Sequence, residues 1–144
     1  MGVERKPNFV HFCCAVPYRH VDGQIEFCLV VTPEDRSWEF PQVAVPPEAC
    51  GPDMVLEQAR LQAGLYGFID PPKPLGQYAS SRGDTAKQIT AFLMRVDRVD
   101  DLGSAVGRRR WCRAVEANAR IRRKPMRRLI DVAQRILAGQ TVCP

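Results

Sequence analysis

The sequence predicts an α+β domain in which helices cover a β-sheet. Two apolar runs near the N-terminus flank Asp22-Gly23, a pair of residues typical of a tight hairpin turn. A further strand-like run covers residues 88–96, and residues 125–137 carry apolar side chains at helical spacing. The elements follow the order β–β–β–α–β–β–α, which favours one shared core. At 144 residues the chain fits a single domain, 1–144.

The N-terminal strands are expected at Phe9–Tyr18 and Ile25–Val31. The second run is almost continuously apolar, as is typical of a strand covered on both faces. Residues 38–45 extend the pattern as a short segment that Pro41 keeps from being a central strand. In this segment Trp38 and Phe40 alternate with a glutamate, so we expect the two rings to share a face and to belong to the core.

A first helix is predicted to begin at Pro52 or Asp53, after a loop rich in proline. Proline is pre-organised for a first helical turn, and an aspartate there favours the positive end of the helix dipole. Gly64 or Gly67 can end this helix. The residues that follow are expected to be a proline-rich connector that leads into the next strand.

The C-terminal part begins with the strong strand Gln88–Val96. A short strand around Trp111 and a helical segment follow, and Pro125 restarts a last helix. Apolar side chains on one face of that helix are expected to pack on the core: Met126, Leu129, Ile130 and Ala133.

The six cysteines suggest neither a zinc site nor a disulfide framework. No C-x-x-C pair occurs, and His11 and His20 are not spaced like zinc partners. Cys13, Cys14 and Cys28 lie in apolar strand-like runs, where a free cysteine behaves as a small hydrophobic residue. We therefore expect reduced and mostly buried thiols.

The start of the chain lacks the apolar region of a secretory signal. Its longest apolar runs are far shorter than the ~20 residues that a spanning helix needs. We therefore expect a cytoplasmic protein that does not enter a membrane.

The net charge of +5 is concentrated in one segment. Between Arg108 and Arg128 the sequence has many arginines and a lysine against a single carboxylate, Glu116. Such a segment suits anions such as phosphates, nucleotides or nucleic acid. An RNA-associated binding protein is therefore one candidate function, and a solvated helix face that serves solubility is the competing interpretation.

The stretch "SWEFPQVAVPPEACGPDMVLEQARLQAGL", residues 37–65, resembles the signature region of the Nudix hydrolase family. "EDRSWEFPQ" is similar to the family's lead-in, "AGL" matches the close of its helix, and the basic C-terminal region is similar to that of many members. The resemblance implies an α/β/α sandwich with a mixed β-sheet between helices. It also implies hydrolysis of a pyrophosphate linkage in nucleoside diphosphate-linked or polyphosphorylated small molecules, with Mg²⁺ or Mn²⁺ held by carboxylates.

The family signature, G-x5-E-x7-R-E-U-x-E-E-x-G-U with U a bulky apolar residue, is degenerate in this chain. Aligned on Gly64, its metal-binding carboxylates fall on Gln58, Leu61 and Gln62. These positions share one helix face, but amides and a leucine supply neither the charge that Mg²⁺ prefers nor a general base. We therefore expect a vestigial metal site with no cofactor, and a protein that binds a phosphorylated ligand without standard hydrolysis.

Hydrolysis by displaced carboxylates is the alternative. Glu48 and Glu57 are close to the signature in sequence and are the candidate catalytic residues. This interpretation would require Mg²⁺ or Mn²⁺. The competing interpretation for each residue is a solvated surface carboxylate.

Four cations are candidates for contact with ligand phosphates. The resemblance suggests Arg36, Arg82 and Lys87, and the basic segment suggests Arg110. Each has a competing interpretation as a solvated side chain. Trp111 is either part of the core or a stacking platform for a base. Homodimers are common in the family, and the resemblance allows one here.

Overall fold

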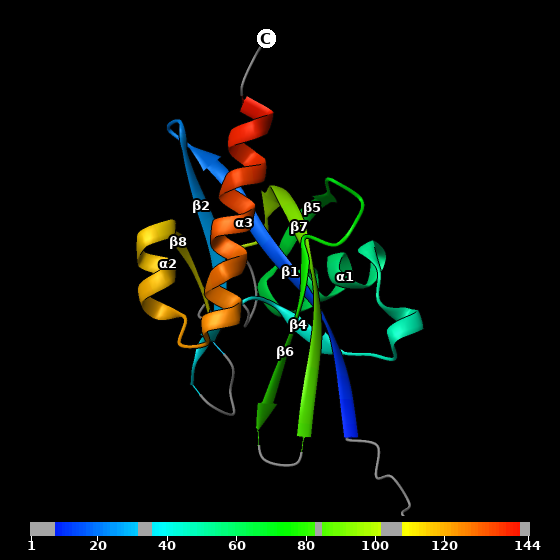
Figure 1. Ribbon diagram of the computed structural model, residues 1–144. Coiled ribbons are helices and arrows are strands. Elements are labelled where there is room, and N and C mark those ends of the chain that lie inside the picture. The colour runs from blue at the N-terminus through cyan, green and yellow to red at the C-terminus, as the bar shows by residue number, and fades with distance from the viewer. Residues whose placement is uncertain (1–7, 32–35, 83–84, 102–107, 142–144) are drawn as a thin grey trace, which may run out of the picture.

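The computed structural model describes residues 8–31, 36–82, 85–101 and 108–141, except for the side chains of residues 8, 9, 80–82, 85, 140 and 141 (Figure 1). Within these ranges the chain forms an eight-stranded sheet and three α-helices. The strands are β1 (Asn8–Val21), β2 (Gln24–Val31), β3 (Trp38–Glu39), β4 (Gln42–Ala44), β5 (Leu65–Ile69), β6 (Gly76–Arg82), β7 (Thr85–Val99) and β8 (Arg109–Arg113). The helices are η1 (Pro47–Ala49, a 3-10 turn), α1 (Pro52–Ala63), α2 (Ala114–Arg120) and α3 (Lys124–Thr141). No helix among the described residues is long and apolar enough to span a membrane.

The sheet is mixed, as expected. Its central pair, β1 and β7, runs parallel from the pair Asn8 and Thr85 to the pair Tyr18 and Arg95. The other pairs are antiparallel, and the strand order is β3-β2-β1-β7-β5. In addition, β4 pairs with β1, β6 with β7, and β8 with β2. The long β1 therefore pairs with β2 near its end and with β4 near its start.

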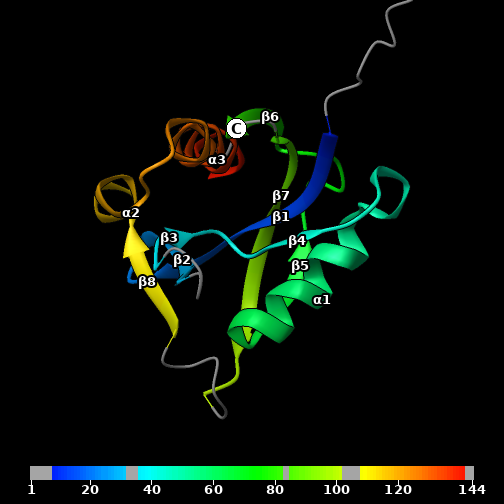
Figure 2. The same ribbon diagram turned by 90° about the horizontal axis from the view of Figure 1, so that it is seen from below.

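Helices cover both faces of the sheet. Figure 2 shows α1 on one face and α2 with α3 on the other. Alternation along β1 supplies the two cores, because successive strand side chains point to opposite faces. Cys14 and Val16 belong to the cluster that includes the buried residues of α3, whereas Cys13 and Ala15 pack with those of α1. This arrangement confirms the predicted α/β/α sandwich.

Helix α1 begins and ends where the sequence predicts. It starts at Pro52, has Asp53 in its first turn, and ends at Gly64, which has φ of 65°. Only glycine adopts this left-handed conformation without cost. A Cβ atom at Gly64 would also lie 2.9 Å from the carbonyl oxygen of Asp100. The glycine therefore lets the start of β5 approach the end of β7.

The predicted connector after α1 is in part a strand. β5 begins directly after Gly64 and pairs with β7 along the edge of the sheet. Gly67 interrupts the apolar residues of β5, and for this reason the sequence pattern does not predict the strand. A Cβ atom at this position would lie 1.8 Å from the carbonyl oxygen of Arg95, so only glycine fits at this close approach of two strands.

The two other predictions about the core are confirmed. The apolar face of α3 packs on the sheet, with Met126, Ile130 and Ala133 fully buried and Leu129 nearly so. Phe40 is buried, and Trp38 packs against the same cluster.

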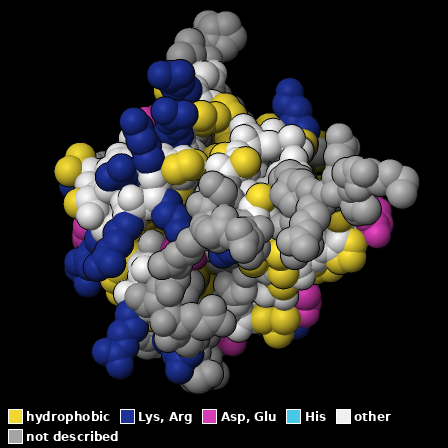
Figure 3. All heavy atoms as spheres, turned by 60° about the horizontal axis from the view of Figure 1, so that its bottom comes forward, with side chains coloured by type: hydrophobic (Ala, Val, Ile, Leu, Met, Phe, Trp, Pro, Cys, Tyr) yellow, Lys and Arg dark blue, Asp and Glu magenta, His cyan; other side chains and the backbone are white. Residues whose placement is uncertain are grey.

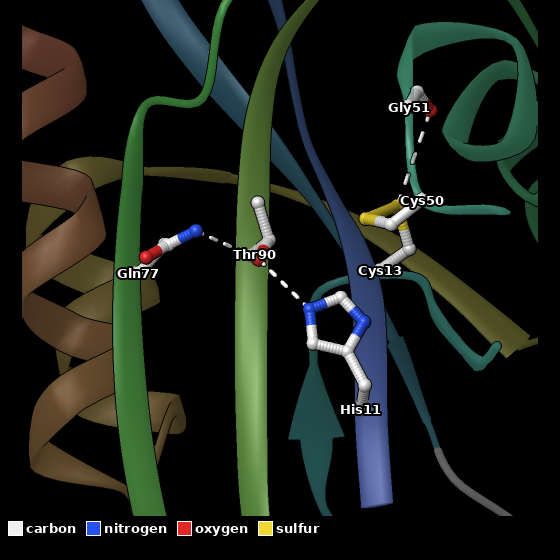
Figure 4. The surroundings of a disulfide bond; sticks show 6 residues. All are labelled: His11, Cys13, Cys50, Gly51, Gln77 and Thr90. Carbon is white, nitrogen blue, oxygen red and sulfur yellow. Dashed lines mark hydrogen bonds between the residues drawn. A yellow bond between two sulfur atoms is a disulfide. The ribbon is translucent and has the colours of Figure 1, made fainter. Parts of the chain in front are cut away.

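The expectation of reduced thiols is wrong for one pair. Cys13 in β1 and Cys50, between η1 and α1, form a disulfide with their Cα atoms 5.5 Å apart (Figure 4). Cys14, Cys28 and Cys112 are buried and unpaired. The two bonded cysteines are 37 residues apart, so only the folding of the loop back onto β1 brings them together. The C-x-x-C spacing of metal motifs gives no sign of such a pair.

Candidate functional site

The face of α1 that corresponds to the Nudix signature carries a hydrogen-bond network. Gln58 and Gln62, one helical turn apart, are half-buried, and Gln62 Nε2 donates to Gln58 Oε1 at 2.9 Å. The same nitrogen donates to the main-chain oxygen of Gln42 in β4 at 2.7 Å. Gln58 and Gln62 are called the glutamine pair below. The pair therefore ties α1 to the neighbouring strand through one amide group.

The residues present at this face do not fit a Mg²⁺ or Mn²⁺ ion. The amide nitrogen of Gln62 lies within hydrogen-bond distance of two oxygens, those of Gln58 and Gln42, that could otherwise face a cation. An amide N–H group donates and cannot coordinate a metal. Leu61, the third signature position, is apolar and 55% exposed. Among the described residues no cluster of three His, Cys, Asp or Glu side chains could hold a metal.

The two candidate catalytic carboxylates lie outside this network. Glu57 is exposed on α1 and forms an ion pair with Arg60 in the next turn. The hydrogen bond from Arg60 lowers the pKa of the Glu57 carboxyl. Glu48 is exposed in η1. The structure thus brings together Gln58 and Gln62 of the predicted residues, but joins them to neither glutamate by a hydrogen bond.

Two residues that sequence reasoning missed extend the network across the sheet. Gln42 Nε2 donates to Glu39 Oε2 at 2.6 Å, and Glu39 Oε1 lies 3.7 Å from Arg123 Nε. Glu39 is only 6% exposed. A buried carboxylate is tolerated when it is paired and hydrogen-bonded, as this one is. The only sequence signal was a charged residue between two core aromatics.

The end of α1 is held by an arginine from β8. Arg109 has a side chain that is 6% exposed, and its guanidinium donates to the main-chain oxygens of Ala63 (2.7 Å) and Asp100 (2.6 Å). It also pairs with Asp101 at 2.5 Å. This contact satisfies carbonyls at the C-terminal ends of α1 and β7, where a positive charge also complements the helix dipole. One of the ten basic residues of the segment is therefore structural.

The candidate phosphate-binding cations come from separate elements. Lys87 is half-buried in β7, with its ammonium 4.7 Å from the centroid of the Phe12 ring. Arg110 in β8 lies 3.4 Å from Glu116. These strands are separated in the sheet by β2 and β1. Arg36 is exposed and has φ of 50°, and the side chain of Arg82, at the end of β6, lies outside the described part of the chain.

Trp111 lies partly buried against the core on the α1 side of the sheet. The guanidinium of Arg19 lies 3.9 Å from its ring centroid, and Arg19 also pairs with Glu26 at 2.9 Å. Stacking with a guanidinium already covers one face of the indole. This arrangement favours the core interpretation of Trp111.

The chain is similar over most of its length to solved structures of Nudix proteins. An Ap4A hydrolase from C. elegans matches with a TM-score of 0.75 and 18% identity, covering 90% of this chain and 98% of that one. The NUDIX domain of Shewanella oneidensis NrtR, solved in complex with ADP ribose, matches with a TM-score of 0.65 and 16% identity, covering 92% and 90%. The E. coli ORF135 protein matches with a TM-score of 0.62 and 14% identity, covering 94% of this chain and 96% of that one.

These matches show that the chain has the Nudix fold, as its sequence suggested. No protein-family model and no curated protein sequence matches it. At these identities the likeness concerns the fold alone, because one fold hosts many chemistries. Function must therefore be argued from the residues of the site.

Proposed function

We propose that this chain binds a phosphorylated small molecule and does not cleave it by the metal-dependent mechanism of Nudix hydrolases. The observation that carries the proposal is the hydrogen bond from Gln62 to the main-chain oxygen of Gln42. Gln58 and Gln62 are neutral, and the amide of Gln62 is bonded to the main chain and to Gln58. Neutral amide oxygens without a carboxylate bind Mg²⁺ poorly, and without a bound metal no water is activated there.

The same network supports a binding role, because it keeps the shape of the site. Glutamine has nearly the volume of glutamate, and its amide holds α1 against β4 without a metal. Two solved relatives of the fold bind nucleotides by their own descriptions: one is an Ap4A hydrolase, and another was solved with ADP ribose. A ligand with phosphate groups is therefore the class to test first.

Cations supply the attraction for such a ligand. We assign this role to Arg36, Arg82, Lys87 and Arg110, each to be tested by substitution with glutamine. Arg36 is exposed, and a guanidinium can bind a phosphate through two parallel hydrogen bonds. Lys87 acts as a point charge beside Phe12. Because the four residues lie on different elements, loss of affinity in only some of the variants would locate the phosphates.

The test is phosphate or nucleotide release from nucleoside diphosphate sugars, dinucleoside polyphosphates and diphosphoinositol compounds. It is run with and without Mg²⁺ or Mn²⁺, and binding of the same compounds is measured by calorimetry. The matched control is Glu48→Gln together with Glu57→Gln, because both side chains are exposed and their loss should leave the fold intact. We expect saturable binding and no metal-dependent turnover.

Three other results would be decisive. Metal-dependent turnover that disappears in the Glu48→Gln, Glu57→Gln variant would overturn the proposal and show that catalysis uses displaced carboxylates. Turnover that survives in that variant would also overturn it and direct attention to other carboxylates. If the protein neither bound nor cleaved any compound of the panel, a role in binding these phosphate compounds would be refuted.

The cytoplasmic location and a homodimer remain predictions. A disulfide is typical of oxidising compartments, so counting the thiols of the protein as isolated from cells tests the first. If Cys13 and Cys50 are reduced there, the cytoplasmic location is supported. Analytical ultracentrifugation tests the second.

A further inference from the structure

The C-terminal helices carry positive charge that the fold does not use. Four basic residues between 108 and 128 have described partners: Arg109 contacts carbonyls and Asp101, Arg110 and Arg120 pair with Glu116, and Arg123 lies near Glu39. The remaining six side chains are exposed or half-exposed, and Figure 3 shows basic side chains gathered on the side of the molecule where α2 and α3 lie. This surface, called the basic face, consists of the four of these residues that lie at or just before the start of α3, namely Arg122, Lys124, Arg127 and Arg128.

The positive charges of the basic face lie at the N-terminal end of α3, where they lower the stability of the helix. Helix α3 begins at Lys124, has Arg127 and Arg128 next in its first two turns, and has no acidic residue in its first turn. The N-terminal end of a helix carries a partial positive charge, so each cation there costs a few tenths of a kcal/mol or more. Arg122, just before the helix, adds to the repulsion. Stability alone therefore does not account for this arrangement, whereas a bound anion would relieve it.

The side chains of this surface favour a nucleic acid over a lipid membrane as its partner. A helix that lies on a membrane needs an exposed apolar side, but the apolar side chains of α3 are buried against the sheet. Val115 in α2 is the only large apolar side chain that is exposed in the described parts of α2 and α3. Three of the four cations are arginines, whose planar groups match phosphate oxygens.

The same surface offers little for reading bases. Neither α2 nor α3, as described, contains an aromatic residue that could stack on an unpaired base. Contacts to phosphates position a protein on nucleic acid but carry no sequence information. Contact through charge alone is therefore expected to be weak and sensitive to salt.

We propose that the basic face binds the phosphate backbone of nucleic acid without selecting a base sequence. This site is separate from the glutamine pair, because α1 lies on the opposite face of the sheet from α2 and α3 (Figure 2). The interaction has a dissociation constant on the order of 1–100 µM at physiological salt, as is typical of non-specific binding.

The test measures binding of the full chain to fluorescent 20-base-pair DNA and RNA duplexes by anisotropy from 50 to 200 mM salt. The variant is Arg122→Gln with Arg128→Gln, and the control is Arg60→Gln with Arg98→Gln. Arg60 and Arg98 are exposed on α1 and β7, away from the basic face. Each pair of substitutions lowers the net charge by the same amount, and circular dichroism checks that both variants fold.

The basic-face variant should weaken binding on the order of tenfold or more and reduce the slope of log K against log salt by about 2, since each lost phosphate contact removes roughly 0.9. The control should keep both the affinity and the slope. Equal losses in the two variants would show that only net charge matters and would overturn the proposal. Absence of duplex binding, or binding only to anionic lipid vesicles tested in parallel, would overturn it as well. Unchanged binding of the small phosphate compounds in the basic-face variant would show that the two sites are independent.

Discussion

The side-chain nitrogen of Gln62 in α1 lies 2.7 Å from the main-chain oxygen of Gln42 in β4. An amide group thus makes the contact between helix and strand at the helix face where the Nudix signature places carboxylates and a metal. The same nitrogen also donates to Gln58 Oε1. A protein with this arrangement can keep the geometry of the fold while it lacks the charge of a metal site.

Restoring the carboxylates should restore metal binding. In a Gln58→Glu, Leu61→Glu, Gln62→Glu variant, three like charges on one helix face should lower the free energy of unfolding without metal, by about 1–3 kcal/mol when the lost hydrogen bonds are included. Adding Mg²⁺ at 100 times its dissociation constant should raise the free energy of unfolding of this variant by about 2.7 kcal/mol. Thermal melting with and without Mg²⁺ measures both effects. The wild type is the control, and a variant that melts at the same temperature at every Mg²⁺ concentration would count against the alignment on Gly64.

The disulfide should contribute strongly to stability. It closes a loop of 37 residues between β1 and the start of α1, and the chain-entropy model gives about 4 kcal/mol for such a loop. Cys50→Ser is the suitable variant, because Cys50 is half-buried and Cys13 is in the core. Urea unfolding should show the loss, and a reducing agent should destabilise the wild type but not the variant. Equal sensitivity of both proteins to reductant would contradict this account.

Arg109 should be the most sensitive arginine of the basic segment. Arg109→Met removes the donor to the carbonyls of Ala63 and Asp100 and should lower the free energy of unfolding by about 2–4 kcal/mol, because buried carbonyls lose their partners. Arg113→Gln is the matched control, since Arg113 is an exposed arginine of the same strand and should change stability by less than about 0.5 kcal/mol. Urea unfolding compares them. Similar losses in both variants would show that charge rather than hydrogen bonding matters at this strand.

Alkaline pH should destabilise the fold through its buried thiols. Burial raises the pKa of Cys28 from its ordinary value of 9.0 to about 12. The thiol is therefore neutral in the folded chain while it ionises in the unfolded chain above pH 9. The contribution of the Cys28 thiol to the free energy of unfolding is complete below pH 9. It is lost as the pH rises towards 12, and the free energy of unfolding falls by up to about 1.4 kcal/mol per pH unit.

The measurement is the free energy of unfolding at several pH values between 7 and 11 for the wild type and Cys28→Ala. The variant should be less stable at pH 7, because the substitution leaves a cavity, but its stability should fall less steeply above pH 9. Burial also raises the pKa of Cys14, which is present in both proteins and serves as an internal constant. Parallel curves would exclude Cys28 as a source of the pH dependence.

Local sequence signals predicted much of the fold for identifiable reasons. Asp22-Gly23 is a turn pair, Pro52 and Gly64 mark the ends of α1, and all of them act within a few residues of chain. Strand β5 escaped prediction because Gly67 looks like a helix terminator in sequence. In the folded chain it is a contact point, where a side chain would collide with the backbone of β7.

The candidate site was predictable only in part. The spacing of Gln58 and Gln62 placed both on one helix face, and in the structure the two side chains are joined by a hydrogen bond. Their partner, the main-chain oxygen of Gln42, has no sequence signature, because every residue carries such an oxygen. Glu39 looked like a polar residue between two aromatics, yet its burial depends on Gln42 and Arg123, which reach it from other elements.

The sequence by itself determined the hairpin of β1 and β2, the limits of α1, the neutral character of the signature face and the concentration of charge after residue 107. These features depend on residue identity and local spacing. Only the tertiary structure decided which arginines are used inside the fold, that Cys13 meets Cys50, and that Gln62 bonds to β4. The physical reason is the same in each case. A contact between groups far apart in the chain depends on how the sheet and helices pack, and the same side chain can face water or a partner according to that packing.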